Sequence, residues 1–111
     1  MNFPEDQIAE LKRYFGELSV AREGGITYLM LQNVTLPGGC TPARMDLLLC
    51  PFERDGYPSR LYFAQQVQCA KGLNWNGSVR ILERNWFAFS WRVANGLRLL
   101  QMVQEHMRAL R

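Results

Sequence analysis

The chain of 111 residues has few of the residues from which metal and disulfide sites are built. It contains three cysteines and one histidine, and Cys40, Cys50 and Cys69 form no CxxC pair. Since structural zinc sites use closely spaced Cys and His pairs, we expect neither a metal ion nor a cofactor. An odd number of cysteines without a secretory leader also favours reduced thiols.

Long hydrophobic runs and blocks of a single charge are absent as well. No apolar stretch approaches the ~20 residues of a membrane span, and the first residues lack the basic and apolar regions of a signal peptide. We therefore expect a cytoplasmic protein that does not bind a membrane. The net charge is +3, but the sequence has no Lys/Arg block and no aromatic RNA-binding motif, which argues against nucleic acid as a partner.

What is present predicts one globular α+β domain spanning residues 1–111. Hydrophobic residues make up 48% and charged residues 21% of the chain, which is typical of a folded domain. Residues 4–18 are predicted to form a helix, because Ile8, Leu11, Phe15 and Leu18 recur at helical spacing.

Four strand-like segments follow this helix, and turn residues separate them. They span residues 19–22, 26–36, 45–50 and 61–67. Their short links favour an antiparallel meander over parallel crossovers. A loop at 68–77, an extended piece at 79–82 and a helix from Ser90 complete the chain. The predicted order is thus an N-terminal helix, a four-stranded antiparallel meander sheet, an irregular loop and a C-terminal helix.

Several short motifs resemble the ubiquitin-conjugating enzyme fold and its RWD-domain relatives. The run from Asn76 to Leu82 (Asn-Gly-Ser-Val-Arg-Ile-Leu), with Trp86 after it, resembles the family's Asn-Gly-x-Ile-Cys-Leu-x-Ile-Leu stretch and its tryptophan. Tyr57-Pro58 matches the family's Tyr-Pro turn, and Leu61-Tyr62-Phe63 matches the strand that follows it. Leu36-Pro37-Gly38-Gly39 resembles small bacterial members, which are found beside ubiquitin-like proteins and activating enzymes.

The family's catalytic residues are not matched in this sequence. Arg80 stands at the position of the catalytic cysteine, and a permanently protonated guanidinium is no nucleophile. The family's His-Pro-Asn motif falls at residues 70–72, or one residue earlier, and neither register supplies its asparagine. The resemblance therefore implies a non-catalytic pseudo-enzyme. Its active-site-like loop would include Ala70, Lys71, Gly72, Trp75, Asn76 and Gly77.

The resemblance also implies protein partners. Members of the family recruit the activating enzyme through the first helix, where Lys12 and Arg13 would form part of a polar contact face. We expect binding to a ubiquitin-like protein, to its activating enzyme or to a conjugating-enzyme partner. The pathway would be a prokaryotic conjugation pathway and, by analogy alone, one used in antiphage defence.

Two other functions stay open. In a non-standard transferase, Cys69 or Ser78 would carry the ubiquitin-like protein as an ester, because the neighbouring Lys71 favours a nucleophilic thiolate at Cys69. Lys71 and Arg80 would then stabilise the developing oxyanion. The other possibility is a small α+β adaptor that is unrelated to the family.

The remaining expectations concern burial. Cys50 lies in an apolar strand and should be buried, whereas Cys40 follows a turn glycine and should be accessible. His106 has no acidic neighbour at helical spacing, so we expect a surface or packing residue and not a general base. Trp86 and Trp91 are expected to pack. Trp75, in a polar loop, is as readily an exposed contact as a packing residue.

Overall fold

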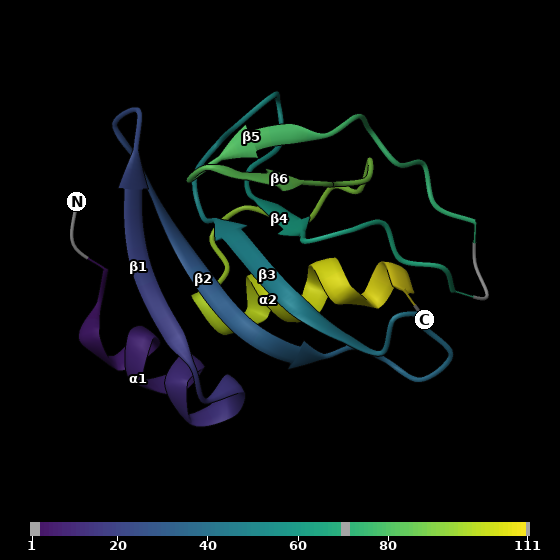
Figure 1. Cartoon of the computed structure of the whole chain (residues 1–111). Helices are drawn as coiled ribbons and strands as arrows, with labels where there is room; N and C mark the ends of the chain where they lie inside the picture. Colours follow the sequence, from purple (N-terminus) through teal and green to yellow (C-terminus); the bar gives the residue numbers. More distant parts are fainter. Residues whose placement is uncertain (1–2, 70–71, 111) are drawn as a thin grey trace.

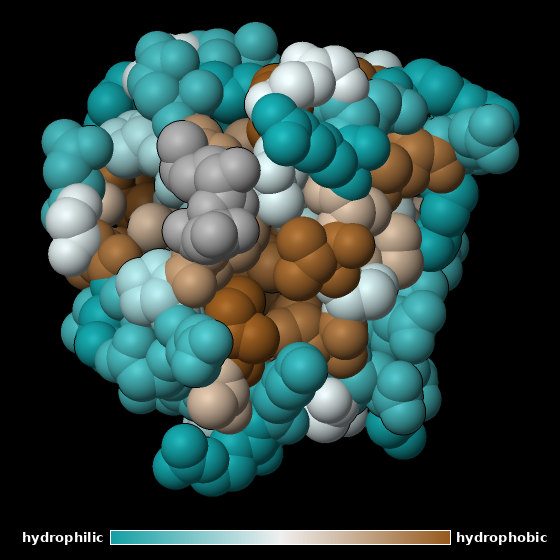
Figure 2. All heavy atoms as spheres, turned by 90° about the vertical axis from the view of Figure 1, so that its left-hand side faces the viewer, coloured by the Kyte–Doolittle hydropathy of each residue, from teal (hydrophilic) through white to brown (hydrophobic). Residues whose placement is uncertain are grey.

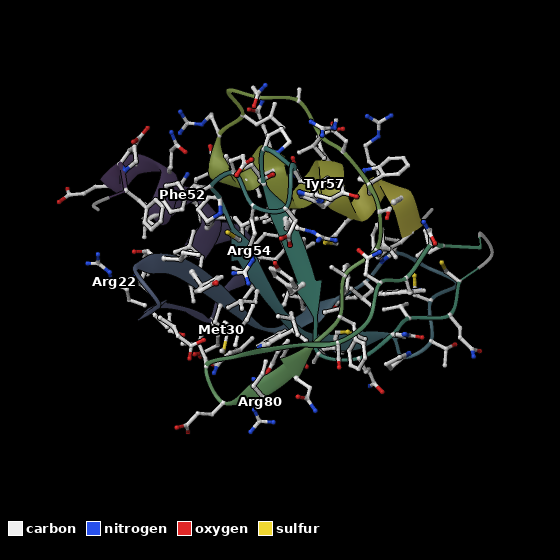
Figure 3. The ribbon with its side chains drawn as sticks, turned by 90° about the horizontal axis from the view of Figure 1, so that it is seen from above. Arg22, Met30, Phe52, Arg54, Tyr57 and Arg80 are labelled. Atoms are coloured by element: carbon white, nitrogen blue, oxygen red, sulfur yellow. The ribbon has the colours of Figure 1, made fainter. Side chains whose placement is uncertain are left out.

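The computed structural model describes residues 3–69 and 72–110 and has three layers: helices, a four-stranded sheet and a hairpin (Figures 1 and 3). The elements are, in chain order, α1 (Glu5–Phe15), β1 (Leu18–Glu23), β2 (Ile26–Thr35), β3 (Arg44–Cys50), β4 (Arg60–Phe63), β5 (Val79–Ile81), β6 (Arg84–Trp86), α2 (Leu99–Met107) and a final 3-10 turn (Arg108–Leu110). The α+β class, the helix at each end and the antiparallel sheet agree with the sequence prediction.

The first helix starts and stops where local chemistry favours it. Pro4 lies immediately before the first residue of α1, and the first turn carries two acidic residues, which the helix dipole favours. Gly16 ends the helix. Leu11 is fully buried, and Ile8 and Phe15 pack against the same core. Leu18 was expected on this helical face, but it begins β1 instead.

The sheet is a meander with the strand order β1-β2-β3-β4, all neighbours antiparallel. A two-residue turn joins β1 to β2 at Gly24 and Gly25, whose positive φ angles of 59° and 79° suit the twist of a tight hairpin. The register shifts between Leu31 and Val34, where Asn33 donates its backbone N–H to Asp46 Oδ1 at 2.8 Å. β4 ends at Phe63, earlier than predicted, because the chain bends at residues 64–65; the N–H of Ala64 still donates to the carbonyl oxygen of Asp46 at 3.2 Å.

Each face of the sheet buries its own hydrophobic cluster. Both helices pack on one face, which we call the helix-side face; its core includes Leu11, Leu29, Leu47, Phe63 and Val103. The opposite, outer face buries Tyr28, Leu48 and Tyr62 under residues of β5 and β6. A sheet covered on both faces accounts for the nearly continuous burial along β3 and β4.

The hairpin of β5 and β6 was only half predicted, since the sequence pattern indicated a single extended piece. Its turn residues Leu82 and Glu83 both have positive φ angles. Two polar contacts fasten the hairpin to the sheet. Leu82 donates its N–H to Glu23 Oε1 at 3.1 Å, and Arg84 pairs with Asp46 at 3.1 Å.

The prediction of a helix starting at Ser90 is wrong, because α2 begins only at Leu99. Ser90 does not cap a helix: its N–H donates to the carbonyl oxygen of Asn74 at 2.9 Å, and this bond holds the segment extended. Gly96 has a φ of 76°, a left-handed conformation that interrupts any right-handed helix. The segment from 90 to 98 is therefore irregular, although Val93 within it is still buried.

Candidate functional site

Arg80, which the sequence resemblance aligns with a catalytic cysteine, is the exposed residue of β5, between half-buried Val79 and buried Ile81. Figure 3 shows its side chain pointing away from the body of the molecule. Its guanidinium donates to Asn85 Oδ1 on β6 at 3.3 Å. Gly77 and Ser78 are exposed just before the strand. The position is thus accessible, but it presents a cation and no nucleophile.

Cys69, the thiol considered as an alternative nucleophile, packs on the other side of the sheet from this hairpin. Cys69 is half-buried and packs against the helix-side core, whereas Val79 and Ile81 beside Arg80 pack against the outer-face core. Lys71, the cation expected to activate Cys69, lies outside the described residues, as does Ala70. The structure therefore gives Cys69 and Arg80 no common site.

The other two thiols are buried. Cys40 was expected to be accessible, but it is only 8% exposed, because the loop that carries it packs into the helix-side core. Burial raises the pKa of Cys40, and the neighbouring Cys69 adds to this effect. Cys50 is fully buried, as predicted, and burial raises its pKa too. Neither thiol is poised to act as a nucleophile.

The exposed tryptophan is Trp91, which was expected to pack, whereas Trp75 packs. Trp75 packs edge-on against Phe63 and Phe89, with ring centroids 5.6 and 5.1 Å apart, so it is a packing residue. Trp91 was expected to pack, but it is 40% exposed, because the segment that carries it is irregular and lies at the surface. Its indole N–H donates to the carbonyl oxygen of Glu105 at 3.1 Å, which holds the ring in place.

Asn76, in the loop that resembles the family's active site, is the centre of a polar network. Its backbone N–H donates to the carbonyl oxygen of Ala88 at 2.8 Å. Its side chain accepts from Arg60 at 2.7 Å and donates to Ser90 Oγ at 3.3 Å. These bonds clamp the loop against β4 and the segment after β6. Gly72, at the other end of the loop, is exposed.

Arg60, which sequence reasoning did not single out, holds this network together. Its side chain is only 9% exposed, and a buried guanidinium is stable only when its N–H groups have acceptors. They donate to Asp55 at 3.3 Å, to Asn76 and to the carbonyl oxygen of Phe89 at 3.4 Å. The guanidinium also lies 4.5 Å from the ring centroid of Tyr57. The sequence did offer one indication of this buried arginine, because Arg60 is a lone charged residue at the start of an apolar strand.

A surface cleft of about 590 Å³ opens above this network. It is lined by Asp55, Tyr57, Ser90, Trp91 and Arg92. Arg92 donates to the carbonyl oxygen of Gly56 and lies 5.6 Å from the ring centroid of Tyr57. Guanidinium and indole groups at a surface are suited to contacts with planar or anionic groups.

The single histidine is buried under β4. His106 Nε2 lies 3.0 Å from Ser59 Oγ, and the two residues are 3% and 1% exposed. Burial lowers the pKa of His106 to about 4, and the positive charge of Arg60 acts in the same direction. A hydroxyl–imidazole pair of a hydrolase has to be reached by substrate. This pair is enclosed, so His106 is a packing residue, one of the two roles expected.

Within residues 3–69 and 72–110, no three His, Cys, Asp or Glu side chains are close enough together to hold a metal ion. In the same part of the chain, no helix has the length and apolar character needed to cross a membrane. No family model, no curated protein and no solved structure shows significant similarity to the chain.

Proposed function

We propose that the protein is a non-catalytic relative of ubiquitin-conjugating enzymes that acts by binding another protein. Its partner would be a ubiquitin-like protein, its activating enzyme or an active conjugating enzyme, in a prokaryotic, cytoplasmic conjugation pathway such as one used in antiphage defence. The observation that carries the proposal is Arg80, which stands exposed on β5 where the family motif requires a cysteine.

The architecture supports this proposal. A helix, a four-stranded antiparallel meander, a long loop and a C-terminal helix follow one another in the order that the resemblance implies. The family-like run from Asn76 to Leu82 forms the end of the loop and the strand β5. Because unrelated proteins can share an α+β order, this support concerns the fold more than the function.

The chemistry at the site favours binding over catalysis. Ser78 is exposed near Arg80, but a serine nucleophile needs a general base within hydrogen-bond reach. The one histidine is enclosed beside Ser59 and is neutral above its pKa of about 4. The exposed groups of the cleft (Trp91 and Arg92) are of the kinds enriched in protein interfaces.

The first helix offers the contact face for an activating enzyme. Lys12 and Arg13 are both exposed in its last turn. Beside them Tyr14 is 63% exposed. Arg13, Tyr14 and Leu100 line a shallow pocket of about 270 Å³ together with Glu10, whose carboxylate pairs with Arg98 at 3.3 Å. An aromatic ring and two cations on one helix end form a surface that an acidic partner surface can match.

The test incubates the protein with ATP and with the ubiquitin-like protein and activating enzyme encoded in its gene neighbourhood. We expect no covalent adduct by intact mass spectrometry and co-elution with one partner on size exclusion. Replacing Cys40, Cys50 and Cys69 together by serine should leave pathway activity unchanged. An adduct that disappears in Cys69→Ser or Ser78→Ala would refute the proposal and identify a non-standard transferase.

Charge reversal on the first helix tests the contact face. Arg13→Glu should weaken binding of the activating enzyme by about tenfold, because it replaces an attraction with a repulsion. Arg44→Glu, an equal charge change at an exposed residue of β3, is the matched control and should bind normally. Neither adduct nor complex, or a gene neighbourhood without these proteins, would favour an unrelated adaptor.

A further inference from the structure

Cys40 and Cys69 lie beside an antiparallel bridge between two distant stretches of the chain. Thr41 and Gln68 form this bridge and exchange both backbone hydrogen bonds, at 2.7 and 2.8 Å. In an antiparallel ladder, the pair next to such a hydrogen-bonded pair is a non-hydrogen-bonded one, in which the side chains come closest. One step beyond the bridge, that pair is Cys40 and Cys69.

The burial of the four residues agrees with this register. Thr41 and Gln68 are exposed, and side chains alternate along a strand, so the neighbouring cysteines turn inwards together. Both pack against the helix-side core, with Cys40 8% exposed and Cys69 half-buried. Burial is the main cause that raises the pKa of Cys40, and the charge of Cys69 and a hydrogen bond with its side chain add to it. The two side chains are therefore in contact.

This placement suits a disulfide. The α-carbons of a non-hydrogen-bonded antiparallel pair lie about 4.5 Å apart, within the range of about 4.4–6.8 Å that disulfides span. Cys50 packs in the outer-face cluster, on the other side of the sheet, so it does not compete for either sulfur. Cys40 would lose only a weak S–H contact with the carbonyl oxygen of Leu110, at 4.0 Å.

We propose that Cys40 and Cys69 form an oxidation site, at which hydrogen peroxide converts the two thiols into an intramolecular disulfide. Both are thiols in this structure. Cys69 reacts first, because it is the more exposed of the two. Cys40 is the resolving thiol. Its raised pKa makes it a poor nucleophile towards outside reagents, but it has to reach only the sulfur beside it.

The reaction balances with one peroxide molecule. The sulfur of Cys69 attacks one peroxide oxygen, the O–O bond breaks, and the thiol proton leaves with the departing hydroxide as water. Cys69 is then a sulfenic acid. The sulfur of Cys40 attacks the Cys69 sulfur, so that the S–S bond forms, the S–O bond breaks and the Cys40 proton leaves in a second water. The two sulfurs lose two electrons, which the peroxide gains.

The disulfide would join two connections of the sheet. Cys40 lies in the connection between β2 and β3, and Cys69 lies in the segment after β4 (Figure 1). The bond would close residues 40–69, with β3 and β4 among them, into one covalent loop. Closing a loop of about 30 residues removes chain entropy from the unfolded state. We therefore expect the oxidised protein to be the more stable form.

This oxidation site is separate from the proposed contact face on α1. Figure 1 shows α1 and β1 on the opposite side of the molecule from the two connections. Figure 2 views the α1–β1 side, where apolar residues gather among polar ones. The oxidation needs no partner protein, so it can be measured on the chain alone. Its failure would leave the proposed binding function untouched.

The test treats the whole reduced chain with hydrogen peroxide, removes the peroxide with catalase and alkylates the remaining thiols under denaturing conditions. Peptides are then mapped by mass spectrometry without reductant. We expect a single chain lighter by two hydrogen atoms, with Cys40 linked to Cys69 and with Cys50 alkylated. The midpoint of thermal unfolding should rise by about 10 °C on oxidation and return to its starting value with dithiothreitol.

Three variants separate the roles of the thiols. Cys50→Ala is the matched control and should give the same linked peptide and the same thermal shift. Cys40→Ala removes the resolving thiol, so dimedone should trap a sulfenic acid at Cys69. In Cys69→Ala, Cys40 should remain alkylatable after the same peroxide treatment, because it is buried.

Two results on the wild-type chain would overturn the proposal. One is Cys69 oxidised to sulfinic acid, or linked to Cys69 of a second chain, while Cys40 stays alkylatable. The other is a Cys40–Cys69 link that lowers the thermal midpoint, because such a bond would form only in a distorted chain.

Discussion

Acid should destabilise this protein through one buried residue, His106. The imidazole is enclosed at 3% exposure, with Ser59 Oγ at 3.0 Å from its Nε2 and the Arg60 charge nearby. Protonation would place a second positive charge in this enclosed site. The pKa therefore falls from an ordinary value of 6.5 to about 4 in the folded protein, with burial as the main cause.

The sign and size of the effect follow from proton linkage. Between pH 6.5 and about 4 the unfolded chain binds a proton at His106 while the folded chain does not, so stability falls as pH falls. The contribution of neutral His106 to the free energy of unfolding is fully present above pH 6.5. The pKa difference corresponds to about 3 kcal/mol lost by pH 4, a large part of the roughly 5–15 kcal/mol that stabilises a domain.

The assay is urea unfolding followed by tryptophan fluorescence at several pH values, on the wild type and on His106→Gln. Glutamine cannot be protonated there. The difference in the free energy of unfolding between the wild type and His106→Gln should therefore change by about 3 kcal/mol from pH 7 to pH 4. Ser59→Ala is the control. It should lower the free energy of unfolding by about 1–3 kcal/mol at every pH. The pH dependence of that free energy should stay the same, because burial and not the Ser59 hydroxyl is the main cause of the lowered pKa of His106.

A direct titration can refute this reasoning. The chain has one histidine, so its ring gives one imidazole signal set in an NMR titration. A midpoint near 6.5 in the folded protein would show that the imidazole is solvated. Parallel pH curves for the wild type and His106→Gln would lead to the same conclusion.

Three further predictions concern the hairpin and the thiols. Asp46→Asn should lower the free energy of unfolding by about 0.5–1 kcal/mol in urea titrations, because it weakens the partly exposed ion pair with Arg84; an unchanged midpoint would contradict this. Trp86→Phe should cost about 2 kcal/mol, since the fully buried indole donates to a backbone carbonyl at 3.0 Å. Cys69 should react with iodoacetamide before the two buried thiols, as peptide mapping by mass spectrometry can show.

Much of the sheet could be predicted because its signals are local. Alternating apolar residues and turn residues a few positions apart indicated β1, β2 and β3 within about two residues of their observed bounds. The acidic first turn and the apolar face around Leu11 indicated α1 in the same way.

The C-terminal part shows where local reasoning fails. Val93 and Leu97 continue the helical spacing of α2, so the pattern favoured a helix from Ser90. In the folded chain the Ser90 N–H instead bonds to the loop at Asn74, and Gly96 adopts a left-handed conformation. These tertiary contacts outweigh a helix propensity that amounts to only a few tenths of a kcal/mol per residue.

The sequence by itself thus determined the class, the order of most elements, the absence of a nucleophile at position 80 and the burial of Cys50. Only the tertiary structure decided that Arg60 binds Asn76, that Ser59 meets His106 47 residues later and that Trp91 is exposed while Trp75 packs. The physical reason is the separation along the chain of the residues that interact. Periodicity and turn chemistry act between residues two to four positions apart, whereas these contacts depend on how separate elements pack against one sheet.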